Sequence, residues 1–105
     1  MPTLPPRPTL AALQDYVAEM ERERGFDAQG VIDKCLLLGE EVGELFKAVR
    51  TREGIKTDVP GSHVGSELAD VLIYLCTIAN RCDVDLEAAF REKEALNAQR
   101  RWVGR

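Results

Sequence analysis

Aromatic residues, cysteine and uninterrupted apolar segments are all scarce in this sequence. Aromatic side chains make up 6% of the 105 residues, and the single histidine, His63, has no His or Cys at a metal-binding spacing. The cysteines Cys35, Cys76 and Cys82 show no C-x-x-C pattern, so we expect them to pack, reduced, in the core. The apolar segment 71–79 is too short to cross a bilayer. These features favour a protein of a reduced compartment without a membrane partner.

The sequence also lacks a net positive charge. The formal net charge is −4, which argues against a protein that binds a nucleic-acid backbone. Residues 1–10, MPTLPPRPTL, lack the apolar core of a secretory signal, and we therefore expect a cytoplasmic protein. Basic residues nevertheless outnumber acidic ones over residues 91–105, which include Arg91, Lys93, Arg100, Arg101 and Arg105. That basic end is a candidate partner for an anionic ligand.

Helical periodicity without an alternating strand pattern predicts an all-α fold. The first eight residues hold four of the five prolines, which predicts an extended arm (1–8) before a single domain (9–105). Glycine and capping residues divide this domain into four helices, at about 10–24, 30–52, 63–82 and 86–101.

The ends of these helices are marked by residues with local capping preferences. Thr9 and Asp85 are favourable N-caps for the first and the fourth helix, because their side-chain oxygens can accept from free backbone N–H groups. Gly25 is expected to end the first helix, since glycine adopts the left-handed conformation found there without strain. For the third helix, Ser62 or Ser66 is the predicted cap.

The second and third helices carry features of surfaces that meet other helices. Gly39 and Gly43 lie four residues apart within the second helix, where each costs about 1 kcal/mol relative to alanine. Close approach of another helix is a reason to keep them. Residues 71–79 are apolar on nearly every side, which predicts a helix that is buried all round. The glycine pair and the apolar segment together predict a homo-oligomer, either a homodimer or a homotetramer, whose interface completes the core.

Two short acidic clusters interrupt the apolar pattern. Glu40, Glu41 and Glu44 lie in the second helix, and Glu67 and Asp70 open the third. Glu41 and Glu44 share a helical stripe otherwise filled by leucine and alanine, whereas Glu40 lies further round. One such acidic pair is usually a solvated helix face, but two pairs in apolar helices need counter-charge. Oxygen-only ligands favour Mg²⁺, or Mn²⁺ in its place, over zinc.

The acidic pattern also carries a resemblance to a known family. The spacing E-E-x-x-E, then E-x-x-D after 22 intervening residues, resembles the MazG-like nucleotide pyrophosphohydrolases of the all-α NTP pyrophosphatase superfamily. The likeness is closest to the small dCTP pyrophosphatase type and extends over LLLGEEVGELFKAV and ELADVLIYLCTIANRCDVDLEAAFREKEALNAQRRW. It implies a four-helix MazG-like bundle, completed by homo-oligomerisation. It further implies Mg²⁺-dependent hydrolysis of a nucleoside triphosphate to the monophosphate and pyrophosphate, as part of nucleotide-pool housecleaning.

The resemblance also implies roles for individual residues. The metal ligands that it implies are Glu41, Glu44, Glu67 and Asp70. Chemistry adds that a carboxylate not fully committed to metal can take the proton of the attacking water, and Glu41 or Glu40 is the candidate for this general base. The residues that it implies for the substrate are Phe26 for the base and Lys93, Asn97 and Arg101 for the phosphates. For these last three, a solvated helix face is the alternative interpretation.

Substrate and function are left with alternatives. The dCTP pyrophosphatase type has a second aromatic residue after its first acidic cluster, but here Val49, Arg50 and Thr51 occupy that region, which leaves the preferred base open. A phosphoribosyl-ATP pyrophosphohydrolase is a second interpretation within the superfamily. A non-catalytic helical interaction module with a structural metal is the third.

Overall fold

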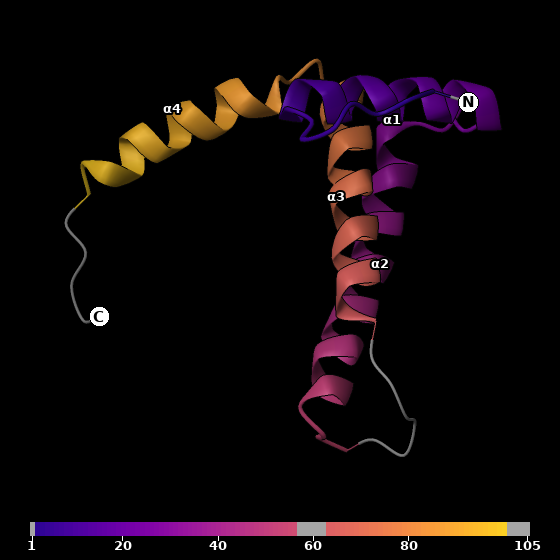
Figure 1. Ribbon diagram of the computed structural model, residues 1–105, viewed down its shortest axis with the longest axis vertical. Helices are drawn as coiled ribbons and strands as arrows, with labels where there is room; N and C mark the ends of the chain where they lie inside the picture. The colour runs from indigo at the N-terminus through magenta and orange to yellow at the C-terminus, as the bar shows by residue number, and fades with distance from the viewer. Residues whose placement is uncertain (1, 57–62, 101–105) are drawn as a thin grey trace.

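Four α-helices are the only regular elements in residues 2–56 and 63–100, the parts of the chain described by the computed structural model. Their bounds are α1 Leu10–Arg24, α2 Val31–Arg52, α3 Val64–Arg81 and α4 Leu86–Ala98 (Figure 1). The predicted all-α class is therefore confirmed. The first three helices begin and end within one residue of their predicted bounds, whereas the fourth ends three residues earlier than predicted.

Local capping fixes several of these ends as the sequence predicts. The Thr9 side chain accepts from the Ala12 N–H at 3.0 Å, and the Asp85 carboxylate accepts from the Ala88 N–H at 3.1 Å. Gly25 follows α1 with φ of 76°, the left-handed conformation that residues with a side chain rarely adopt. These three signals are short-range, which is why the sequence alone locates them.

The start of α3 differs from the prediction. His63 occupies the N-cap position, and its side chain makes no capping hydrogen bond. Ser66 lies inside the first turn, so its prediction as a cap is wrong, and Ser62 lies outside the described residues.

The helices form an open arrangement. α2 and α3 pack along their lengths as an antiparallel hairpin, α1 crosses one end of it, and α4 extends away from the hairpin on the other side (Figure 1). The core lies where α1 meets α3 and consists of Val17, Met20 and Cys76. Within the described residues, one chain therefore does not close a four-helix bundle by itself.

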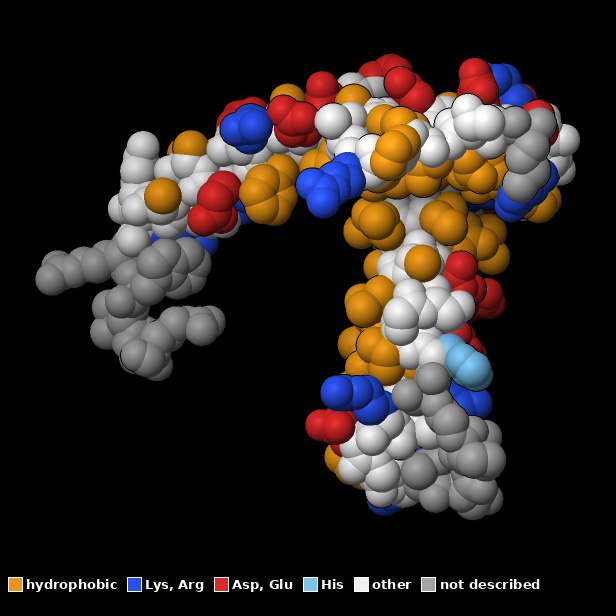
Figure 2. Space-filling model, in the orientation of Figure 1, with side chains coloured by type: hydrophobic (Ala, Val, Ile, Leu, Met, Phe, Trp, Pro, Cys, Tyr) orange, Lys and Arg blue, Asp and Glu red, His pale blue; other side chains and the backbone are white. Residues whose placement is uncertain are grey.

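Much of the apolar surface that the sequence predicts to be buried is exposed in the single chain. In α3 only Cys76, Thr77 and Ala79 are buried, while Leu72 and Leu75 are 39% and 42% exposed. An apolar groove of about 560 Å³ separates α3 from α4. Apolar side chains cover the side of the α2–α3 hairpin that faces α4 (Figure 2).

The same open arrangement overturns part of the cysteine prediction. Cys76 is buried as expected, but Cys35 on α2 and Cys82 at the end of α3 are exposed, because nothing in the described part of the chain covers them. Gly39 and Gly43 likewise have no atom near the position that a β-carbon would occupy. The close approach that their spacing predicts is therefore absent from the described part of one chain. Among the described helices, none combines the length and the hydropathy needed to span a membrane.

Candidate functional site

Three carboxylates from two helices meet on the α2–α3 hairpin. Glu41 on α2 and Glu67 and Asp70 on α3 each offer an oxygen, and these oxygens all lie within 4.8 Å of one another. All three residues are half-buried. Their convergence follows from the sequence: Glu67 and Asp70 are one helical turn apart, and the antiparallel packing sets that turn against Glu41. Three negative charges this close repel one another unless a proton or a cation neutralises them.

The environment of Glu41 shows this repulsion. Its carboxyl pKa is raised above the ordinary value, first by burial, then by a hydrogen bond with Glu67 and by the negative charges of Asp70, Glu67 and Glu44. Glu44 thus lies close enough to act on Glu41 electrostatically, although it is exposed and stands outside the three-carboxylate group. Glu40 is also exposed and outside the group. Carboxylate oxygens from two rigid helices are a donor set that suits a hard divalent cation.

A small cavity of about 180 Å³ adjoins the carboxylates. It lies between α1, α2 and α3, and Asp70 belongs both to its wall and to the acidic group. Phe26, Lys34 and Tyr74 also line it. The structure therefore brings the sequence-predicted Phe26 and Asp70 to one cavity, whose wall also includes a lysine and a second aromatic ring.

Tyr74 also lies beside the acidic group, a place that sequence reasoning missed. Burial raises the pKa of its hydroxyl, and the negative charges of Glu41, Asp70 and Glu40 raise it further. The hydroxyl therefore stays protonated and can donate a hydrogen bond. Its position one turn after Asp70, on the same helix face, is the signal that could have found it.

A buried ionic cluster forms part of the cavity wall, which Glu21 and Lys34 both line. Glu21 and Lys34 are each 3% exposed, and Lys34 Nζ lies 3.1 Å from Glu21 Oε2. Arg81 binds both oxygens of the same carboxylate, at 2.7 and 2.9 Å. Burial alone would raise the pKa of Glu21, but the hydrogen bonds and charges of Arg81 and Lys34 outweigh it and hold the pKa below its ordinary value.

Lys34 connects this cluster to the cavity. Its ammonium donates to Gln29 Oε1 at 2.7 Å and lies over the rings of Phe26 and Tyr74, 5.3 and 5.7 Å from their centres. Sequence reasoning overlooked Lys34. The available signal was its place on the helical stripe of Glu41, seven residues earlier, where the pattern otherwise has apolar residues.

The predicted phosphate-binding residues of the fourth helix are not brought to this cavity. Lys93 is exposed and lines the apolar groove between α3 and α4. Asn97 is half-buried near the end of α4, and Arg101 lies outside the described residues. The described residues that line the cavity come from α1, α2, α3 and the connection between α1 and α2, and none comes from α4.

Comparison with known proteins matches the part of the chain that includes α2 and α3, the helices that carry the three carboxylates. Residues 29–99 match the family described as the MazG nucleotide pyrophosphohydrolase domain. The chain is 37% identical to dCTP pyrophosphatase 1 of Mus musculus over 102 residues, and 34% identical to dCTP pyrophosphatase 1 of Homo sapiens over 102 residues. Each match covers 90% of this chain and 60% of the relative, so the chain spans about three-fifths of the length of these relatives.

Proposed function

The chain belongs to the MazG nucleotide pyrophosphohydrolase family, and from that premise we propose that it hydrolyses a nucleoside triphosphate to the monophosphate and pyrophosphate. The observation that carries the proposal is the meeting of Glu41, Glu67 and Asp70 within 4.8 Å. The names of the relatives make dCTP the first deoxynucleotide to test. Removal of unwanted nucleotides from the pool is the physiological role that we propose.

We propose Mg²⁺, with Mn²⁺ as a substitute, as the cofactor held by this group. Glu41, Glu67 and Asp70 present the oxygen ligands, and Glu44 adds negative charge beside them. A bound divalent ion supplies charge neutralisation for the phosphate oxygens and a lowered pKa for a water molecule. The fit rests on the donor set: three carboxylates that repel one another are each satisfied by one shared cation.

The remaining chemical tasks fall to side chains of this chain. A carboxylate that is not committed to the metal can take the proton of the attacking water, and Glu40, outside the three-carboxylate group, is the first candidate, with Glu41 the second. The base of the nucleotide is proposed to stack on Phe26, at the cavity that Asp70 shares. Tyr74 lies between the two regions and can donate to a phosphate or sugar oxygen.

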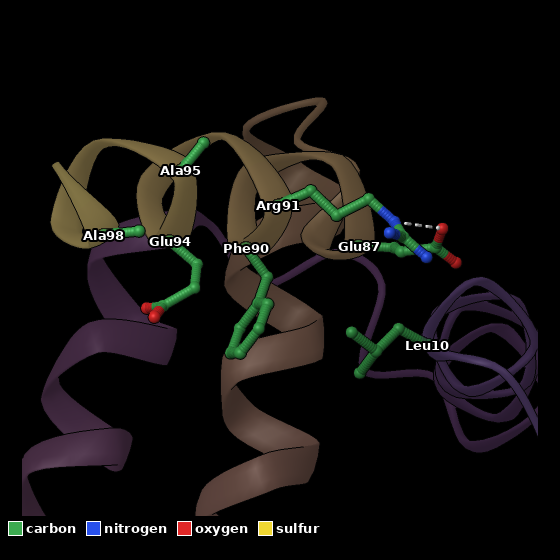
Figure 3. A pocket seen from close by; sticks show the side chains of 7 residues that line it. All are labelled: Leu10, Glu87, Phe90, Arg91, Glu94, Ala95 and Ala98. Carbon is green, nitrogen blue, oxygen red and sulfur yellow. Dashed lines mark hydrogen bonds and ion pairs between the residues drawn. The ribbon is translucent and has the colours of Figure 1, made fainter.

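We propose that a second copy of the chain completes the site, as a homodimer or within a homotetramer. Leu72, Leu75 and Phe90 are exposed along the groove between α3 and α4, and a contiguous apolar surface of this kind marks an interface. In Figure 3, Phe90 and Leu10 point into the same open space beside α4. Since Lys93 lines this groove, a second chain seated there is proposed to bring its own carboxylates toward Lys93, Asn97 and Arg101 for phosphate binding.

The proposal is tested by measuring pyrophosphate release from dATP, dCTP, dGTP and dTTP, with and without Mg²⁺. We expect turnover only with Mg²⁺ or Mn²⁺. We also expect Glu41→Gln and Asp70→Asn to lower kcat/KM by at least about 100-fold, because each removes a ligand charge. Glu19→Gln, an exposed position on α1, is the matched control and retains activity.

Two results would defeat the proposed activity. One is wild-type turnover of Glu41→Gln and Asp70→Asn in variants whose folding is verified by circular dichroism. The other is an absence of turnover with all nucleotides while chelation lowers the unfolding temperature, which identifies a structural metal in an interaction module. Faster turnover of phosphoribosyl-ATP than of any deoxynucleotide would instead identify the chain as a phosphoribosyl-ATP pyrophosphohydrolase of the same superfamily.

A further inference from the structure

Arg81, at the C-terminal end of α3, uses every donor of its guanidinium group. Nε donates to the carbonyl of Gln29 at 2.8 Å. Nη1 donates to Glu21 Oε1 at 2.7 Å and to the carbonyl of Thr77 at 3.0 Å. Nη2 donates to Glu21 Oε2 at 2.9 Å and to the carbonyl of Phe26 at 3.1 Å. An arginine has five N–H groups in a rigid fork, and here all five are matched to acceptors.

Two of these bonds hold the connection between α1 and α2. Every residue from 22 to 30 is exposed, so burial of apolar side chains does not fix this segment. Phe26 itself is 44% exposed. The segment is tied to α3 through the Phe26 and Gln29 carbonyls, and both bonds come from Arg81. The Phe26 N–H also donates to the Glu21 carbonyl of α1 at 2.8 Å, so Arg81 supplies the hydrogen bonds that fix Phe26 relative to α3.

The consequence of this anchoring appears at the cavity. Phe26 forms part of the wall, and the Lys34 ammonium lies over its ring and over the ring of Tyr74. Gln29, which Arg81 holds by its carbonyl, accepts from the same ammonium through its side chain. Arg81 does not line the cavity and does not belong to the acidic group. Of the residues that line the cavity, Arg81 contacts Phe26, Glu21 and Thr77, and Phe26 is the one that it holds in an exposed segment.

We infer that Arg81 is a positioning residue for nucleotide binding: it fixes the α1–α2 connection and thereby holds Phe26 in the cavity wall that also includes Asp70. The inference rests on the proposed function, because it takes the cavity as the place of the nucleotide. Preorganisation of this kind lowers the ordering cost of binding and leaves the metal-centred chemistry alone. Loss of the anchor is therefore a loss of binding, seen in KM more than in kcat.

The test is a double-mutant cycle between Arg81→Lys and Phe26→Ala, with the deoxynucleoside triphosphate that the wild type turns over fastest. Lysine keeps the charge next to Glu21 but has three donors, all on one nitrogen, in place of five, so it cannot bind both carboxylate oxygens and both carbonyls at once. We expect Arg81→Lys to raise KM by about tenfold, because two anchoring hydrogen bonds are lost, with kcat within about twofold of the wild type.

Phe26→Ala should raise KM by a similar factor, and the double variant should be no worse than either single one, because both changes remove the same wall. Arg22→Lys, on the exposed side of α1, is the matched control and keeps the wild-type KM. Hydrogen exchange of residues 25–30 should accelerate in Arg81→Lys while the α2 and α3 amides stay protected.

Several outcomes overturn the inference. KM effects that add across the cycle, an unchanged KM in Arg81→Lys, or a fall in kcat at constant KM each show that Arg81 does not act by placing Phe26. Unchanged hydrogen exchange of residues 25–30 in Arg81→Lys would show that Arg81 does not anchor this segment. These failures are distinct from failure of the proposed function, which is recognised by a wild-type protein that turns over no nucleotide.

Discussion

Replacement of Asp70 by asparagine should stabilise the metal-free protein while it removes the proposed activity. The side chain keeps its shape but loses its charge, and with it the repulsion against Glu41 and Glu67, whose oxygens lie within 4.8 Å. At that separation Coulomb's law gives about 1 kcal/mol per pair in water and about 3 kcal/mol at the effective dielectric constant of a protein surface. The group is half-buried and screened by salt, so we expect a net gain of about 1 kcal/mol at neutral pH.

The assay is urea unfolding followed by circular dichroism, first in EDTA and then in Mg²⁺. In EDTA, Asp70→Asn should show the higher free energy of unfolding, and the difference should shrink as NaCl is added. In Mg²⁺ the order should reverse, because an ion at about ten times its dissociation constant stabilises the wild type by about 1.4 kcal/mol and the variant hardly at all. Asp15→Asn, an exposed change on α1, is the control and should respond to neither condition.

A lower free energy of unfolding for Asp70→Asn in EDTA would refute the reasoning, since it would mean that the carboxylates do not repel one another in the folded protein. Equal stabilisation of both proteins by Mg²⁺ would refute it as well, because the ion would then bind elsewhere.

Two further predictions concern the buried ions and the apolar groove. The pKa of Glu21 is lowered below its ordinary 4.5, so its contribution to stability is present above that pH and is lost as the pH falls through the folded-state pKa. Glu21→Gln should therefore be less stable than the wild type at pH 7, and its unfolding free energy should fall less steeply with decreasing pH. Parallel acid limbs in the two plots of unfolding free energy against pH would contradict this. Phe90→Glu places a charge on a side chain that is 66% exposed beside the groove, and it should shift sedimentation velocity to a smaller species than the wild type, whereas Glu87→Gln on the same helix should not.

The sequence predicts those parts of the structure that depend on short-range rules. Thr9, Gly25 and Asp85 mark helix ends through contacts with residues at most four positions away. The meeting of Glu41 with Asp70 could also be predicted, because each acidic pair interrupts an apolar face and two such faces pack together. The catalytic and substrate roles of these residues stay predictions until the variants are measured.

The rest depends on long-range geometry that periodicity does not contain. The ion pairs of Glu21 with Lys34 and Arg81 join three helices, and no local sequence pattern around these residues predicts which partner each one has. The exposure of Cys35 and Cys82 escaped prediction for a related reason: an apolar helix pattern favours burial but does not specify which residues pack against it.

The connection between α1 and α2 has a consequence for how proteins of this architecture diversify. No side chain between residues 22 and 30 is buried, so most replacements there cost the fold little free energy. Yet this stretch supplies Phe26, a wall of the cavity beside the carboxylates. If the proposed function holds, selection can therefore change the preferred nucleotide at a few surface positions while the proposed ion-binding hairpin stays intact.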